Sequence, residues 1–171
     1  MRTGLVILLA GLAASCSPKA VETPFDTTLS TKDLMQHVID PAAVALWGRA
    51  GEMQTANGEV VDLAPDTEEE WKAAESEAAT VAEAGNLLIL PDRVRVLKDA
   101  KGEPAKADGG DWTKFALEMT QRALAVKIAT VARDKDKMFE TGGDLYQTCV
   151  ACHDKYYVPF LKDGEATKAP R

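Results

Sequence analysis

The sequence predicts an all-α fold, an antiparallel bundle of four helices, from three observations. Alanine, leucine, glutamate and lysine are plentiful, while runs of strand-forming residues are scarce. Four stretches repeat apolar residues at helical spacing, and segments containing proline or glycine separate them. The 171 residues are enough for one domain with a sizeable core. Four helices with one apolar seam each bury those seams most simply against one another.

Residues 1–15 have the pattern of an export signal. Arg2 gives a positive start, an apolar run over 5–14 is too short to span a bilayer, and small residues precede Cys16. The segment resembles a bacterial lipoprotein signal, except that Ala13 holds a place where leucine is usual. This resemblance implies lipidation of Cys16, whereas ordinary cleavage would leave its thiol free. Both alternatives place the protein outside the cytoplasm, and we expect it in the periplasm with a lipid anchor.

A tether over 16–29 precedes the first helix, because this stretch has two prolines after Cys16 and no helical period. The helix begins at Ser30, which forms a capping-box pattern with Asp33, and it runs to about Trp47. Because proline lacks an N–H and clashes with the preceding turn, we expect a kink just before Pro41.

The second helix follows a loop over 48–65. Thr67 and Glu70 form another capping-box pattern, which opens a helix over 68–90 that Pro91 ends. Its apolar stripe consists of Trp71, Ala74, Ala78, Val81, Ala82 and Ile89. The spacing of these residues predicts one buried face.

The third helix comes after a long connection over 91–110, for which the sequence indicates no function. Asp111 is its expected cap, and it ends near Arg133. Its apolar face consists of Trp112, Phe115, Met119, Ala123, Val126 and Thr130. We expect the three tryptophans of the chain to anchor the hydrophobic core.

The fourth helix spans about 134–157, and the paired glycines Gly142 and Gly143 are a weak point within it. Its inner face consists of Met138, Leu145, Cys149, Cys152 and Tyr156. The bundle then covers 30–158, and a polar tail over 159–171 ends the chain.

The end of the fourth helix holds the main chemical signal, a Cys-x-x-Cys-His motif at Cys149, Cys152 and His153. This is the attachment pattern of a c-type haem, in which two thiols bind the porphyrin covalently and the imidazole ligates the iron. Positions i, i+3 and i+4 share one helix face, so all three side chains can address one flat ring. The expected cofactor is one covalent haem c.

Three other interpretations of the motif have less support. A thioredoxin-type dithiol normally follows a strand, and none is expected before Cys149. A zinc site needs about four ligands, whereas the chain adds only His37 and Cys16 as histidine or cysteine candidates. The two cysteines could also be core residues beside an ordinary histidine. With Cys16 lipidated and the other two cysteines on haem, no disulfide is expected.

The residue on the other side of the iron decides the function, and the first helix offers Met35 and His37. About 200° separates them around the helix axis, so only one can face the haem. A regular helix would bury Leu34, Met35, Val38, Ile39, Ala42, Ala45 and Leu46. We therefore expect Met35 to be the distal ligand, with a core-filling methionine as the alternative. His37 is expected at the surface, and its ligation is the weaker alternative.

The motif and the first helix together resemble the cytochrome c′ family. The resemblance covers about 30–157 and rests on Met35, Cys149, Cys152, His153 and Tyr156. It implies a four-helix bundle with the haem on its last helix. One branch of the family has five-coordinate iron that binds gases such as nitric oxide or carbon monoxide. In the other branch, methionine on the first helix makes a low-spin electron carrier, and Met35 implies this branch.

The expected function is therefore that of an exported monohaem c-type cytochrome, which carries single electrons and is not an enzyme. The alternative is a five-coordinate protein that binds gases; a peroxidase would need a distal acid–base group, and none is apparent. We expect redox proteins as partners, a monomer or homodimer, and membrane contact only through the N-terminal lipid. The net charge of −7 excludes nucleic acid. Candidate partners for the haem propionates are Arg49, Arg93, Arg95 and Arg122.

Overall fold

Most of the residues that the structure describes are helical. The computed structural model describes residues 25–91, 93 and 109–156. The first helix consists of α1 (Thr31–Leu34), the π-helical η1 (Met35–Ile39) and α2 (Asp40–Trp47), and the other helices are α3 (Glu68–Leu88), α4 (Gly109–Ala132) and α5 (Lys135–Tyr156). Strands β1 (Glu52–Gln54) and β2 (Val60–Asp62) form one antiparallel hairpin. The expected all-α class is thus confirmed. The expected export signal, residues 16–24 of the tether, residues 92 and 94–108 of the connection over 91–110, and the polar tail lie outside the described residues.

Both expected capping boxes are present. The backbone N–H of Asp33 donates to Ser30 Oγ at 3.2 Å, and the backbone N–H of Ser30 donates to Asp33 Oδ2 at 2.9 Å. At α3, the N–H of Glu70 donates to Thr67 Oγ1 at 3.2 Å, and the N–H of Thr67 donates to Glu70 Oε2 at 3.0 Å. Each box satisfies backbone donors that a helix start leaves without an internal partner, so both starts follow from the sequence.

The first helix widens just before Pro41. The backbone N–H of Asp40 donates to the carbonyl of Met35, five residues back, which is the π-helical pattern. Pro41 has no N–H to donate and its ring crowds the preceding turn, so a wider turn relieves both problems. The π turn stands where the sequence predicts a kink.

This π turn shifts the buried face of the first helix by one residue. Leu34 and Ile39 are both buried although they are five residues apart, and Ala43 follows them into the core. Ala42 and Ala45, which a regular helix would bury, are only half-buried. Ala42 still packs against the core, but Ala43 takes the fully buried place, because the prediction assumed about 100° per residue through a turn that holds more residues.

The second, third and fourth expected helices each differ from expectation in one detail. α3 ends at Leu88, short of position 90. α4 begins at Gly109, so Asp111 lies in its first turn and is not the cap. α5 continues through Gly142 and Gly143, so the predicted weak point does not interrupt it.

The hairpin was not predicted. Met53 pairs with Val61, and the N–H of Gly58 donates to the carbonyl of Thr55 at 2.9 Å. Gly58 has a φ of +86°, which suits glycine at a tight turn. The sequence signal was Asn57 followed by glycine, a common hairpin turn.

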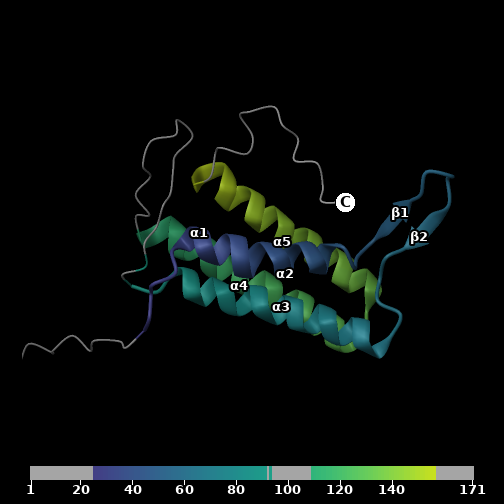
Figure 1. Ribbon diagram of the computed structural model, residues 1–171, viewed down its shortest axis with the longest axis horizontal. Helices are drawn as coiled ribbons and strands as arrows, with labels where there is room; N and C mark the ends of the chain where they lie inside the picture. The colour runs from purple at the N-terminus through teal and green to yellow at the C-terminus, as the bar shows by residue number, and fades with distance from the viewer. Residues whose placement is uncertain (1–24, 92, 94–108, 157–171) are drawn as a thin grey trace, which may run out of the picture.

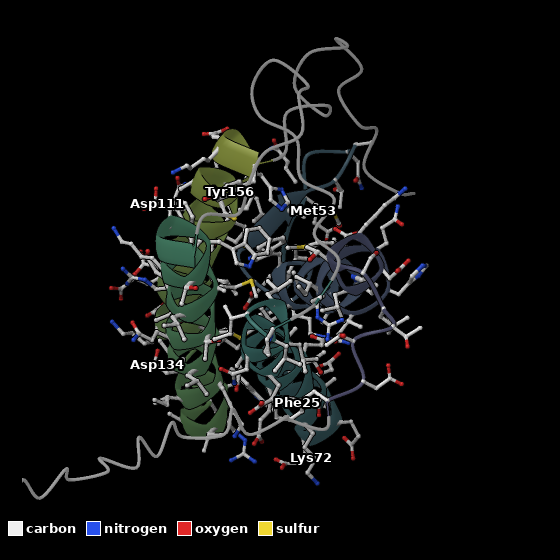
Figure 2. All side chains as sticks on the ribbon, turned by 90° about the vertical axis from the view of Figure 1, so that its left-hand side faces the viewer. Phe25, Met53, Lys72, Asp111, Asp134 and Tyr156 are labelled. Atoms are coloured by element: carbon white, nitrogen blue, oxygen red, sulfur yellow. The ribbon has the colours of Figure 1, made fainter. Side chains whose placement is uncertain are left out.

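The helices pack in the order of the chain. α3 packs against the first helix and against α4, and α4 packs against α5, with successive helices running in opposite directions (Figure 1). Seen from the end that carries Tyr156, α4 and α5 lie on one side and the first helix and α3 on the other (Figure 2). The last turns of α5 are set apart from α1 (Figure 1), so the first helix and α5 diverge toward this end.

Candidate haem-attachment site

The last two turns of α5 carry the Cys-x-x-Cys-His motif. Cys149 and Cys152 are half-buried and pack against the hydrophobic core, and both are free thiols. Burial raises the pKa of Cys149 to about 11 and that of Cys152 to about 12. A dithiol oxidoreductase needs a cysteine whose pKa is lowered. The surroundings of these two thiols therefore argue against the thioredoxin-type interpretation.

His153 follows the two cysteines on α5, and its pKa is influenced by a carboxylate of the first helix. Desolvation lowers the pKa of His153, while the carboxylates of Asp40 and Asp154 act in the opposite direction. Asp40 is the first residue of α2. The imidazole is thus within electrostatic range of the first helix, although the helix axes diverge at this end.

Met35 lies on the side of the first helix that faces the core. Its side chain is half-buried and packs against the same core as Cys149 and Cys152, whereas His37 is exposed. Met35 and Asp40 are joined by the backbone bond of the π turn, so they lie one turn apart on the same helix. Because Asp40 is within range of His153, the structure brings the segment that holds Met35 toward the haem motif. It leaves His37 outside this group.

Aromatic side chains fix the end of α5 that carries the motif. Trp112 Nε1 donates to the carbonyl oxygen of Leu88 at 3.0 Å, which joins α4 to the end of α3. The rings of Trp112 and Tyr156 meet edge to face at a centroid distance of 5.4 Å, and Phe115 contacts Tyr156 at 6.2 Å. Trp112 and Trp71 are buried in the core, as expected. These contacts hold the end of α5 that carries the Cys-x-x-Cys-His motif against α4.

The arginines proposed from sequence for the propionates occupy different places. Arg49 pairs with Glu77 at 3.1 Å, and Arg122 pairs with Asp144 at 3.0 Å. Arg93 is 7% exposed, and its Nε donates to the carbonyl oxygen of Leu87 at 2.9 Å, next to the residue that bonds Trp112. Arg95 lies outside the described residues. Arg93 is therefore the candidate that the structure places at the motif's end of the molecule.

The donor set suits a haem better than a bare metal ion. Within the described ranges, no three His, Cys, Asp or Glu side chains gather as ligands for one ion, so the zinc interpretation finds no site there. A haem requires less from the protein, because the porphyrin supplies four nitrogens and the chain supplies one or two axial ligands. His153 and Met35 are of the axial type, and two free thiols stand beside the histidine.

The chain matches no protein-family model, no curated protein and no solved structure. The site therefore rests on the residues themselves. Among the helices that the structure describes, none is both long and apolar enough to cross a membrane. Cys16, the expected lipidation site, lies outside the described part of the chain.

Proposed function

We propose that this chain is an exported monohaem c-type cytochrome of the cytochrome c′ type, which carries single electrons. Its fold would be an antiparallel four-helix bundle with haem c bound covalently through Cys149 and Cys152. The observation that carries the proposal is the Cys-x-x-Cys-His motif, with both thiols half-buried against the core and Met35 on the segment that faces it.

The ring would lie between α5 and the first helix, because the Cys-x-x-Cys-His motif is on one and Met35 is on the other. α5 packs against α4, and the first helix packs against α3, so each is already held from its other side. Cys149 and Cys152 would hold the ring edge on α5, and Met35 would approach from the first helix. The carboxylate of Asp40 on the first helix acts electrostatically on His153 of α5.

The chain's own residues would set the redox properties. When bound, a haem supplies one-electron chemistry at its iron. His153 and Met35 would be the axial ligands, and a methionine ligand favours a higher potential than a second histidine would. Core residues on α4 and α5 would keep water from one side of the ring, which also tunes the potential. Neither ligand has to transfer a proton, which agrees with a carrier rather than an enzyme.

Gas binding at the sixth position is the second candidate. Met35 belongs to a π turn, and π turns are less regular than α-helix and are frequent at functional sites. A methionine on such a turn is easier to displace than one in a rigid helix. In that case nitric oxide or carbon monoxide would replace Met35 at the iron.

Location and partners follow from the same proposal. We propose that lipidated Cys16 anchors the protein to the periplasmic side of a membrane, and that it exchanges electrons with redox proteins there. Replacing Cys16 with alanine should move the protein from the membrane fraction to the soluble fraction of the cell envelope. Its haem content should not change.

Covalent attachment is the first experiment for this function. The full chain would be produced in a host with the c-type maturation machinery, and intact-mass spectrometry would count the attached haem groups. One haem is expected for the native chain, none for Cys149→Ala with Cys152→Ala, and one for His37→Ala, the control. A native chain without haem would refute the proposal.

A further inference from the structure

We propose that Thr31 and Arg93 together bind one carboxylate of the haem, a propionate. This inference rests on the proposed function and names a subsite within it. The carboxylate would accept a hydrogen bond from the Thr31 hydroxyl and further bonds from the guanidinium of Arg93.

The first observation is a buried hydroxyl without a partner. Thr31 is 3% exposed, and its Oγ1 makes no hydrogen bond with any group in the described part of the chain. The large majority of buried polar side-chain atoms have a partner, and an unpaired one is costly. The hydroxyl is therefore suited to a group that is not part of the polypeptide.

The position of Thr31 indicates which group this is. The backbone N–H of Met35 bonds to the carbonyl of Thr31, so Thr31 lies one helical turn before the proposed iron ligand. Residues four apart lie on the same helix face, so the two side chains face the same region. Thr31 is therefore placed to contact a group that Met35 would hold.

The second observation is a buried cation at the same end. Arg93 is 7% exposed and donates from Nε to the carbonyl oxygen of Leu87, and from Nη1 to that of Leu29, two residues before Thr31. These bonds use two of the five guanidinium N–H donors. No ion pair joins Arg93 to a carboxylate among the residues described, and a buried charge is costly unless it is paired. A planar carboxylate is the partner that its geometry favours.

The neighbouring charges leave this role open to a ligand. Asp33 is engaged with Ser30, and Asp111 pairs with Lys155. Asp26 is exposed, and its pKa is lowered mainly by Thr28 and only slightly by Arg93. Other ionisable side chains at this end of the molecule include Lys32, His37, Asp40, Glu83, Lys114, Glu118, His153 and Asp154, and none of them is buried. The Arg93 charge and the Thr31 hydroxyl are thus the two buried donors available.

The test is an optical redox titration of the haem-loaded chain from pH 4 to pH 9. Ionisation of a propionate appears as a pH-dependent step in the midpoint potential. A hydrogen bond and a nearby cation both favour the ionised carboxylate, so removing either should move the step to higher pH. The variants are Thr31→Val, which keeps the side-chain volume, Thr31→Ser, which keeps the hydroxyl, and Arg93→Gln.

We expect a tenfold or larger shift in proton affinity for Thr31→Val and Arg93→Gln, and none for Thr31→Ser. Thr130→Val is the matched control, because Thr130 is also buried but its hydroxyl donates to Lys127 far from the haem motif. If Arg93→Gln does not fold, Thr31→Val alone decides the matter. Two results would overturn this inference but not the proposed function. One is a Thr31→Val variant that carries haem and shows an unchanged pH-dependent step. The other is a shift of the step that appears only when phosphate is added. A native chain without haem would overturn the proposed function as well.

Discussion

Trp47 donates a hydrogen bond from its indole Nε1 to the carbonyl oxygen of Gly142 at 3.3 Å. The same ring meets Tyr146 edge to face at 5.4 Å. These contacts join the end of α2 to the first half of α5, whereas toward the haem motif the first helix and α5 diverge (Figure 1). The two elements are therefore joined at one end and diverge at the other, and Met35, Cys149 and Cys152 belong to their diverging halves.

Replacing Trp47 with phenylalanine should cost little stability. The variant keeps a ring against Tyr146 and loses the hydrogen bond to Gly142, at a site that is only half-buried. We expect the free energy of unfolding to fall by about 1 kcal/mol, the net value of one such bond. Urea denaturation followed by circular dichroism measures the change. A loss above about 3 kcal/mol in the free energy of unfolding would contradict the small contribution assigned to this bond.

Replacing Trp112 with phenylalanine should cost more. This change leaves the carbonyl of buried Leu88 without its indole partner, at the end of α3 where helix carbonyls lack internal partners. We expect a loss of about 1–3 kcal/mol in the free energy of unfolding. A loss smaller than that of Trp47→Phe would contradict this account of the α3–α4 contact.

Gly85 permits α3 and α4 to approach each other closely. A Cβ at position 85 would overlap Thr120 Oγ1 and lie 2.8 Å from the carbonyl oxygen of Ala116. Thr120 is held there by a hydrogen bond to the carbonyl of Ala82 at 2.9 Å. Gly85→Ala should therefore destabilise the fold by about 1–3 kcal/mol, the usual cost of overpacking.

The matched control for this prediction is Gly143→Ala. Gly143 is exposed in the interior of α5, and a Cβ there would meet nothing within 4 Å. Alanine favours a helix over glycine, so the control should gain about 0.5–1 kcal/mol. Opposite signs for the two substitutions are the expected result, and equal effects would refute the close-packing argument.

The start of α3 should weaken in acid. The backbone N–H groups of Asp66 and Thr67 donate to the Glu70 carboxylate, and these bonds hold its pKa below its usual value of 4.5. A group whose pKa is lower in the folded state stabilises the fold above the unfolded pKa, and this stability is lost as pH falls through the folded pKa.

Glu70→Gln should consequently lower the melting temperature at pH 7, and the difference should shrink as pH falls through the folded pKa and the native carboxylate becomes protonated too. Differential scanning calorimetry at pH 7 and at a series of lower pH values measures this convergence. Glu69→Gln serves as the control, since Glu69 makes no hydrogen bond or ion pair within the described residues. A difference that persists unchanged in acid would count against the capping role of Glu70.

Local signals in the sequence were sufficient to predict where two helices begin. The Ser30 and Thr67 capping boxes form because each needs only residues three apart, and no distant contact competes with them. The start of α4 was different: Asp111 is a good cap by type, but the helix extends two residues further back to Gly109. Helix boundaries of this kind shift by one or two residues without a strong local signal.

The buried face of the first helix shows what a helical wheel cannot supply. The proline at position 41 predicts a distortion of the helix. It does not predict that the distortion is a π turn, which adds a residue between Leu34 and Ile39. Met35 is the first and His37 the third residue of this turn; Met35 packs against the core and His37 is exposed, as expected. Ala42 and Ala45 come after it and are only half-buried, although Ala42 still packs against the core.

The candidate site divides in the same way. Cys149, Cys152 and His153 are recognisable by spacing alone, because the chemistry of attachment requires that spacing. Asp40, Thr31 and Arg93 have no sequence signal, since their relation to the site depends on how three helices and a connection meet. Their roles could be inferred only from burial and contacts.

The measurement that tests the central claim most directly is an optical spectrum of the native protein and of Met35→Ala, oxidised, and reduced with and without carbon monoxide. Ligation by His153 and Met35 predicts a low-spin ferrous native form that takes up carbon monoxide slowly, and a high-spin variant that binds it readily. A native ferrous form that is already high-spin, and that Met35→Ala leaves unchanged, would contradict the assignment and favour the gas-binding alternative.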